Sequence, residues 1–317
     1  MSSSRLTTRV DSNKGQSSPI FGQVYWSLTK SCWMTFAYTG ALLGSYATFQ
    51  WDAVVLFTIT TAITLGAGYS VGLHRCLIHN SFQCSPWLES TLVYLGVLAG
   101  IDGPYSLIES HDLRDWAQRQ PRCHDYFTSR QNLLVDWVWQ IHCDIELHYP
   151  PIFRYESRLV SHRFYQWLEQ TWMLQQFPWA LLFYYFGGWS WVFWGIYLRI
   201  AVCVTSRWLI HYCASRWGDR PYWTEAAAVQ HHNLPFLGLL SLGESWQNNH
   251  QAFPNSARFG ICYGQADPGW WFIQSLGKLG FAWDIQHPQA SLPSRGTLPI
   301  PTIASSQPDR EPRRKVI

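Results

Sequence analysis

The chain alternates between long uncharged stretches and shorter polar segments. A helix needs roughly 20 residues to cross the hydrocarbon core of a membrane, at a rise of about 1.5 Å per residue. Three stretches reach this length without a charged side chain, namely 31–51, 53–73 and 170–198. They predict membrane-spanning helices.

The three stretches predict four spans, arranged as two helical hairpins. The first two stretches meet at 50–52 and form one hairpin. The third is interrupted by the turn signal Gly187 and Gly188, and the span after this pair continues to about His211. Neither hairpin tip carries Lys or Arg, whereas the amino terminus, the middle segment and the tail all do. The bias of cations towards the cytoplasm therefore places the N-terminus, a helical cap and the C-terminus there. The sequence predicts an all-α integral membrane protein.

Two features of this layout allow more than one interpretation. Arg199 lies inside the fourth span, where its side chain either extends to the membrane surface or faces the interior of the bundle. Segment 87–101 is apolar but short and contains Glu89, so we expect an interfacial or buried helix and not a fifth span. The alternative to the whole layout is a Trp-rich soluble helical core, which three uncharged runs of this length disfavour.

Composition supports a lipid environment and excludes several other classes. Only 14% of the 317 residues are charged and 17% are aromatic, but the mean hydropathy of -0.11 requires a substantial polar part beside the spans. A net charge of +3 without a dense basic stripe argues against nucleic-acid binding. The eight cysteines contain no CxxC pair, so we expect reduced thiols and neither a disulfide framework nor a zinc ribbon.

The ends of the chain differ from its middle. Residues 1–30 are predicted to be a flexible cytosolic segment, because they begin Ser-rich and lack the apolar core of a secretory signal. Residues 288–317 are rich in Pro, Ser and Arg and predict a disordered tail. One membrane and cap domain is expected between them, over 31–287.

Candidate chemistry gathers at the predicted cytoplasmic ends of the spans, where histidines recur. On a helix, positions three or four apart share a face, so His111 can act with Asp115, and Gln247 with His250 or Gln251. Imidazole with carboxylate is a normal ligand set for iron. The histidines concerned are His74 and His79 in GLHRCLIH, His111 and His124 at the ends of HDLRDWAQRQPRCH, His211 at the end of the fourth span, and His250 in GESWQNNHQAFP.

A family resemblance rests on these motifs. In order and spacing, GLHRCLIH, HDLRD with CHDY, RWLIHYCASRWGDRPY, GESWQNNHQAFPNSARFG and DPGWWFIQSLGKLGFAWD resemble the membrane-bound acyl-CoA (fatty acid) desaturases, over about 31–287. The resemblance implies two helical hairpins with a cytosolic cap that carries histidine boxes. In that family the boxes hold two iron ions, which use oxygen and electrons to introduce a double bond into a fatty acyl chain.

The chain departs from the family pattern at its metal ligands. Of nine family histidines four remain, which are His74, His79, His111 and His250. The replaced positions hold Arg114 and Asp115 in the second box, Ser215 after the fourth span, where His211 stands in place of the family's Asn, and Gln247 and Gln251 in the third box.

The resemblance and these departures together predict an altered site with one iron ion. The expected ligands are the four remaining histidines and Asp115. Arg114 is expected to supply the positive charge of the missing second metal, or alternatively to face solvent or pair with Asp112 or Asp125. His211, His124, Gln247 and Gln251 are candidates for additional ligands or for supporting the ligands, whereas His231 and His232 rank lower.

Three functions remain open from the sequence. The first is an active oxidoreductase of the desaturase type, which acts on an acyl chain or similar lipid and needs a separate electron donor of the ferredoxin or cytochrome type. The second is a catalytically inactive desaturase-like protein that binds lipid or acts as a scaffold. The third is a membrane assembly or pigment-associated protein. An aromatic lining for a substrate is expected from Trp137, Trp139 and Trp208.

Overall fold

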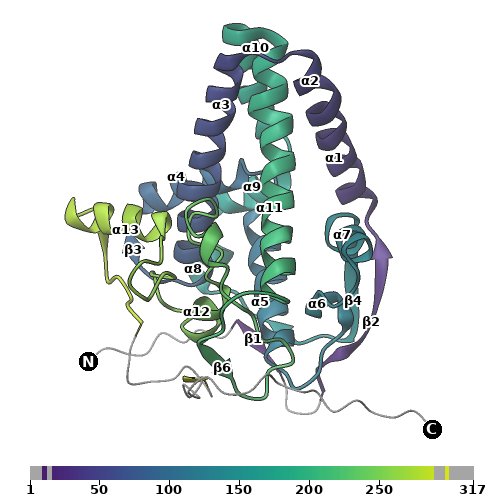
Figure 1. The fold of residues 1–317 in the computed structure, drawn as a ribbon, viewed down its shortest axis with the longest axis vertical. Helices are drawn as coiled ribbons and strands as arrows, with labels where there is room; N and C mark the ends of the chain where they lie inside the picture. Colours follow the sequence, from purple (N-terminus) through teal and green to yellow (C-terminus); the bar gives the residue numbers. More distant parts are fainter. Residues whose placement is uncertain (1–8, 13–15, 289–296, 300–317) are drawn as a thin grey trace.

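Four long helical runs extend side by side from a broader helical body (Figure 1). The computed structural model describes residues 9–12, 16–288 and 297–299, and it is mostly helical. The first run is α1 (Leu28–Thr39), η1 (Gly40–Gly44) and α2 (Ser45–Ala47); the second is α3 (Trp51–Ala62) and η2 (Ile63–Ile78). The third is α10 (Gln176–Val192) up to its turn at Gly188, and the fourth is the rest of α10 with η3 (Phe193–Leu198) and α11 (Arg199–Ala214).

The runs pair into hairpins whose tips contact each other. Gly188 has φ 62° and breaks the helical path, and Phe183 lies against Gly195, a contact that a straight helix of twelve residues could not make. Ser190 Oγ donates to the Thr48 carbonyl at 2.6 Å, and Trp191 Nε1 donates to Asp52 Oδ2 at 2.7 Å. The turns therefore fall at the predicted positions, and both tips lie at the same end of the molecule.

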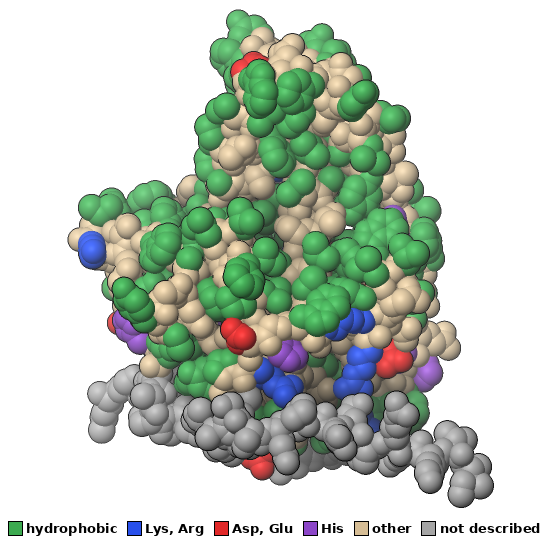
Figure 2. Space-filling model, viewed as in Figure 1, with side chains coloured by type: hydrophobic (Ala, Val, Ile, Leu, Met, Phe, Trp, Pro, Cys, Tyr) green, Lys and Arg blue, Asp and Glu red, His purple; other side chains and the backbone are tan. Residues whose placement is uncertain are grey.

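Two of the helices are long and apolar enough to cross a membrane. They are Trp51–Ile78, with a mean hydropathy of 1.7, and Gln176–Ala214, with 1.3, which includes the turn at Gly188. Side chains such as Leu42, Tyr46 and Tyr185 are largely exposed on this half, and Figure 2 shows its surface covered by hydrophobic side chains. An apolar surface of this extent indicates association with a membrane.

Arg199 faces the interior of the bundle. Its side chain is 2% exposed and donates from Nη2 to Gln176 Oε1, whose amide nitrogen donates to the Leu98 carbonyl at 3.2 Å. Of the two placements considered from the sequence, the structure has the interior one.

The helical body consists of shorter elements placed around the inner ends of the long runs (Figure 1). Among them, α4 covers the predicted short segment and packs against η2, as expected for a helix that is not a span. The body contains α4 (Pro86–Val97), α5 (Pro104–Gln118), α6 (Asp125–Thr128), α7 (Leu133–His142), α8 (Ser157–Val160), α9 (Arg163–Thr171), η4 (Pro235–Leu237), α12 (Gln247–Ala252) and α13 (Pro268–Lys278).

The protein is mostly helical, as predicted, and short strands accompany the helices. The described residues form four antiparallel two-stranded sheets, and one of their strands, β2 (Ser18–Trp26), lies within the segment 1–30 that was predicted to be flexible. The long β2 resembles an ordinary strand in its Ile, Phe, Val, Tyr and Trp content, but its partner lies more than 115 residues away in the chain. The pairs are β1 (Val10–Asp11) with β5 (Ile152–Phe153), β2 (Ser18–Trp26) with β4 (Cys143–Tyr149), β3 (Gln83–Cys84) with β7 (Ala282–Trp283), and β6 (Tyr222–Thr224) with β8 (Thr297–Pro299).

The predicted disordered tail lies mostly outside the described residues. Within 288–317, only Pro288 and 297–299 are described, and the latter pair with β6.

Candidate metal centre

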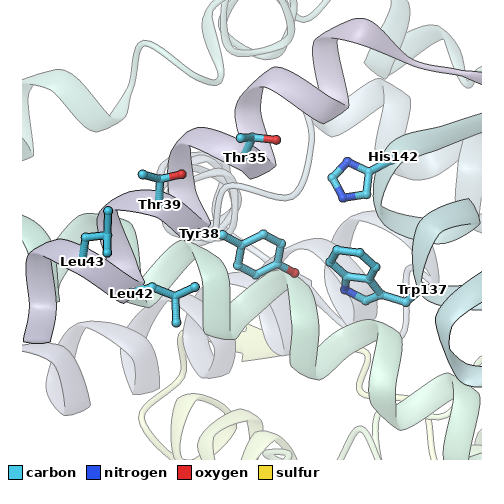
Figure 3. A pocket seen from close by; sticks show the side chains of 7 residues that line it. All are labelled: Thr35, Tyr38, Thr39, Leu42, Leu43, Trp137 and His142. Atoms are coloured by element: carbon cyan, nitrogen blue, oxygen red, sulfur yellow. The ribbon is translucent and has the colours of Figure 1, made fainter.

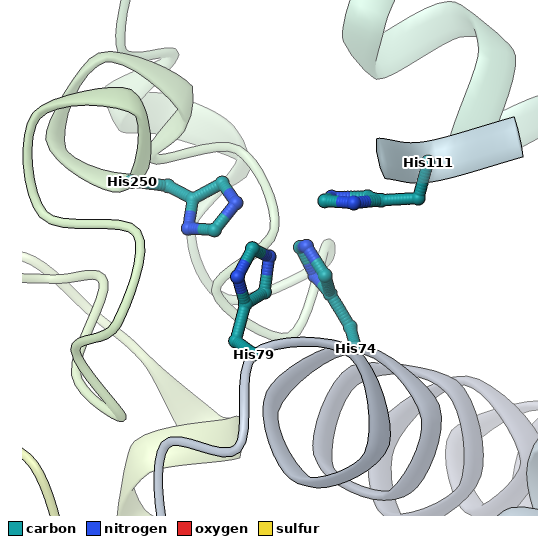
Figure 4. Close-up of side chains that lie close together, drawn as sticks. All are labelled: His74, His79, His111 and His250. Carbon is teal, nitrogen blue, oxygen red and sulfur yellow. The ribbon is translucent and has the colours of Figure 1, made fainter. Parts of the chain in front are cut away.

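Four histidines from three separate parts of the chain meet in the helical body. One ring nitrogen from each of His74, His79, His111 and His250 lies within 4.8 Å of the others. His74 lies in the last turn of η2 and His79 directly after it, His111 lies on α5, and His250 lies on α12. Figure 4 shows the four rings turned towards a common centre.

The helical geometry of η2 explains how His74 and His79 can share a site. In an α-helix, residues five apart differ by about 140° in direction and point to different sides. The end of η2 has the wider π-helical turn, in which residue i bonds residue i+5. The amide of His79 donates to the His74 carbonyl at 3.0 Å, so the two side chains emerge on the same side.

The rings are packed closely but leave nitrogens without partners. The ring centroids of His74 and His79 lie 4.9 Å apart, those of His79 and His250 4.6 Å, and those of His79 and His111 4.8 Å. His74 Nε2, His79 Nε2 and His250 Nδ1 are buried with no hydrogen-bond partner among the described residues. A buried polar atom without a partner is costly, so these nitrogens indicate a bound group.

Carboxylates orient two of the rings. Glu244 Oε2 lies 2.7 Å from His74 Nδ1, and its other oxygen accepts from Ser70 Oγ at 2.6 Å. Asp112 Oδ1 lies 3.1 Å from His111 Nδ1. A carboxylate next to one ring nitrogen fixes the proton there and leaves the opposite nitrogen free to bind a metal.

The donor set fits a bound transition metal. Burial, together with the neighbouring histidines, holds the pKa of His79 and the pKa of His250 well below the usual 6.5. Both rings are therefore neutral near pH 7, which is the form that binds metal. Neutral imidazoles held by carboxylates suit iron, among other transition metals.

Asp115 lies outside the four-histidine group in this structure, so its role as a ligand stays a prediction. Both of its oxygens accept from Arg119 Nε, at 2.9 and 2.8 Å. Although burial raises the pKa of Asp115, the charge of Arg119 outweighs it and lowers that pKa overall. Arg119 also donates to the Gln251 carbonyl at 3.0 Å, so this ion pair links α5 to α12.

Arg114 is partly buried in the helical body, and the described contacts pair it with neither Asp112 nor Asp125. Its Nη2 donates to Gln140 Oε1 at 2.5 Å, and its guanidinium lies 5.7 Å from the ring centroid of Tyr126. Burial, followed by the charge of Arg114, lowers the pKa of His231 to about 4. The positive charge of Arg114 therefore disfavours the protonated form of His231.

The other candidate residues make separate contacts. His211 faces His231 with ring centroids 6.2 Å apart. His124 caps α6 by accepting from the Tyr126 amide at 3.2 Å.

The two glutamines of the third box are bonded within the protein. Gln247 Nε2 donates to the Glu244 carbonyl at 2.6 Å. Gln251 Oε1 accepts from the His231 amide at 3.2 Å, and its Nε2 donates to the Val229 carbonyl at 3.0 Å. Neither belongs to the four-histidine group.

Sequence reasoning missed the residues that support the ligands. Glu244 stands six residues before His250 but acts on His74, and Asp112 was considered only as a partner of Arg114. Asn249, between the box positions, donates to the Phe259 carbonyl at 2.8 Å and fixes α12. The only sequence signal for these residues was a polar side chain inside a histidine motif. It could not identify the partner of that side chain, because the partner depends on the tertiary fold.

A separate apolar groove lies between α1 and α7. Its volume is about 410 Å³, and Figure 3 shows its seven lining side chains, none of which belongs to the four-histidine group. Of the three tryptophans expected to line a substrate site, only Trp137 lines this groove. Trp208 donates to Asp136 and Trp139 packs near Tyr126, so the three do not share one lining here.

Comparison with known proteins identifies the family. Residues 29–262 match the family described as fatty acid desaturase. The chain belongs to this family. Within it, the desaturase-like chain is 31% identical over 243 residues to the sn-2 palmitoyl-lipid 9-desaturase of Nostoc sp. (strain 36), covering 74% of this chain and 81% of that protein.

Relatives whose names give different carriers of the acyl chain have similar sequence identity to this desaturase family member. It is 32% identical to the sn-1 stearoyl-lipid 9-desaturase of Anabaena variabilis, covering 75% of this chain and 85% of that protein. It is 31% identical to the acyl-CoA C20 Delta5-desaturase of Anemone leveillei, covering 76% of each chain.

Proposed function

We propose that the protein is a membrane-bound oxidoreductase that uses iron and oxygen on a fatty acyl chain, with a single metal ion. The observation that carries this proposal is the convergence of His74, His79, His111 and His250 within 4.8 Å, with buried ring nitrogens that have no partner among the described residues.

A single ion is supported by the contacts at positions that hold histidine elsewhere in the family. Arg114 bonds Gln140, Asp115 pairs with Arg119, and Gln247 and Gln251 bond backbone groups. These side chains already have hydrogen-bond or ion-pair partners within the protein. The permanent positive charge of Arg114 would also repel a second cation. In this proposal Arg114 supplies the positive charge that a second metal ion would otherwise provide.

The residues divide the work at the site. The four histidines hold the ion, while Glu244 and Asp112 keep the Nδ1 protons of His74 and His111 in place. When bound, iron supplies the one-electron chemistry needed to activate oxygen. Desaturation removes two hydrogen atoms from adjacent carbons, and one O₂ with two further electrons and two protons becomes two molecules of water. A separate electron donor of the ferredoxin or cytochrome type supplies those two electrons.

We further propose that the four helical runs span the membrane, with the helical body as a cytosolic cap. The tips without Lys or Arg at one end and the polar body at the other support this orientation. The substrate is an acyl chain carried by a glycerolipid or a thioester, as the names of the relatives suggest.

A second candidate function is a desaturase-like protein that binds lipid without oxidising it. The ion pair and hydrogen bonds at the former ligand positions favour it, because they replace half of a site that uses two ions in the family.

Two measurements on the same protein test the proposal. Detergent-purified protein should contain one iron per chain, and expression in a host without its own desaturases should yield unsaturated or oxygenated acyl chains. The matched control is His74→Ala with His250→Ala, which should lose both iron and product. Two irons per chain would refute the single-ion site, and one iron with an unchanged acyl profile would favour the non-oxidising alternative. No iron in the purified parent would refute the metal centre.

A further inference from the structure

Arg9 lies immediately before β1, far from the histidines in sequence, yet its side chain is buried beside two of them. It is 5% exposed, and it donates from Nη1 to the Ile78 carbonyl at 2.9 Å and from Nη2 to the Leu77 carbonyl at 3.1 Å. These are the last two carbonyls of η2, directly before His79. Carbonyls at the end of a helix have no partner inside it, and a guanidinium satisfies both their lone pairs and their partial negative charge.

The same guanidinium reaches a second histidine through a carboxylate. Arg9 Nη1 lies 3.0 Å from Asp112 Oδ2, and the other oxygen of Asp112 lies 3.1 Å from His111 Nδ1. Because a carboxylate only accepts, His111 carries its proton on Nδ1 and presents Nε2 to the centre. One arginine is thus connected to both His79 and His111.

The charge of Arg9 is balanced where it is buried. Its Nε donates to Glu156 at 3.1 and 3.0 Å, and its Nη2 lies 3.0 Å from Glu156 Oε1. Two carboxylates and two carbonyls therefore surround the five N–H groups of the guanidinium. A lysine has a single ammonium and three donors, so it cannot reproduce this set.

We propose that Arg9 is a positioning residue of the metal centre, which fixes His79 through the end of η2 and His111 through Asp112. The inference rests on the proposed metal site and extends it to a part of the chain outside the histidine boxes. The N-terminal segment is then a component of the site and not a separate arm.

Cobalt binding to the metal-free, detergent-solubilised full chain tests this role, because cobalt bound to imidazoles absorbs visible light. Arg9→Gln should weaken cobalt binding by about 10- to 100-fold and alter the visible spectrum at saturating cobalt. The matched control is Arg154→Gln. Arg154 is mostly exposed, pairs with Asp11 at 3.1 Å and belongs to the strand region that binds the Arg9 backbone, but it does not touch η2.

The outcomes separate the inference from the proposed function. A folded Arg9→Gln protein with the affinity and spectrum of the parent would overturn the positioning role. If Arg9→Gln does not fold, Asp112→Asn decides, because Glu156 still balances Arg9 in that variant. Asp112→Asn should bind cobalt at least about tenfold more weakly, and parental binding would overturn the inference. A parent that binds neither cobalt nor iron would instead refute the proposed metal centre, and the inference with it.

Discussion

His111 and Asp115 stand one helical turn apart on α5, yet the structure assigns them to different tasks. His111 contributes a ring nitrogen to the four-histidine group, whereas Asp115 is engaged by Arg119. Spacing of i and i+4 brought both residues to one side of α5. The same spacing applies to Asp115 and Arg119, and that local ion pair is the one that forms.

Iron analysis of two variants should separate these tasks. His111→Ala removes a ligand and should weaken iron binding by more than roughly 100-fold, since loss of a supporting residue alone costs 10- to 100-fold. Asp115→Ala should keep the iron content of the parent. It should lose at most about 1 kcal/mol of stability, because the ion pair with Arg119 that it removes is partly exposed to solvent. Loss of iron in Asp115→Ala would show that this carboxylate binds the metal.

His231 predicts a pH dependence of stability. It is buried, and burial with the charge of Arg114 lowers its pKa to about 4, against roughly 6.5 in an unfolded chain. As the pH falls from 6.5 towards 4, the unfolded state binds a proton that the folded state excludes, so stability is lost in this window. At pH 5 the loss amounts to about 2 kcal/mol.

Thermal unfolding of metal-free protein at pH 7 and pH 5 measures this effect. The midpoint of the parent should fall more between the two pH values than that of His231→Gln. His148 is exposed and serves as the control, so His148→Gln should behave as the parent does. Equal pH dependence in the parent and His231→Gln would contradict the assignment.

At the scale of single residues, the four grouped histidines were easier to predict from the sequence than the residues that hold them in place. The four histidines recur at predicted helix ends, so their grouping could be predicted. Arg9, Asp112 and Glu244 act on ring nitrogens or carbonyls that lie 68 to 170 positions away, or on the adjacent residue. No local spacing indicates the distant partners of Arg9 and Glu244, because the tertiary fold alone brings them together.

At the scale of elements, the approach of α4 to η2 depends on glycine. A Cβ added at Gly68 would lie 2.4 Å from the backbone nitrogen of Gly96 and 2.4 Å from the carbonyl carbon of Leu95. Backbone atoms of a packed helix cannot yield as the end of a side chain can. The helix that carries His74 and ends directly before His79 is therefore held in place by a contact that excludes any side chain at Gly68.

Gly68→Ala should displace α4 and lower stability by about 1 to 3 kcal/mol, the usual cost of overpacking. Gly66→Ala is the matched control on the same helix, because its Cβ would meet only the end of the Leu242 side chain, at 3.2 Å. Thermal unfolding in detergent should therefore show a midpoint several degrees lower for Gly68→Ala and close to the parent for Gly66→Ala. Similar midpoints for both variants would mean that α4 can shift without cost.

Whether an element could be predicted from the sequence depended on whether the interactions that form it are local. The helical runs and the turns at 50–52 and Gly188 follow from uncharged length and from glycine, which are local properties. Strands β2 and β4 pair across 117 positions, between Trp26 and Cys143. Composition at the start of the chain therefore could not indicate that Ser18–Trp26 pairs with a distant strand.

At the scale of the whole molecule, helix length relates the metal centre to the membrane. The helix Trp51–Ile78 has 28 residues and measures at most about 42 Å, against a hydrocarbon core of about 30 Å. In the proposed orientation, with the start of this helix at the tip on one side, its last turn would reach the opposite membrane surface. The histidines at this end are then placed where a chain can leave the lipid and where a soluble electron donor can approach.

Labelling with a membrane-impermeant thiol reagent tests this arrangement. After replacement of the exposed Cys32 and Cys262 by serine, a cysteine introduced at Gln50 reports on the tip and one at Arg122 reports on the helical body; both positions are exposed. Because the two tips are joined through Ser190 and Thr48 at the end opposite the body, the two reporters should react from opposite sides of the membrane. In intact cells the reagent should modify the cysteine at position 50 and spare that at 122 until the membrane is opened. Reaction of both from the same side would refute the four-span arrangement, since the runs would then lie on the membrane and not cross it.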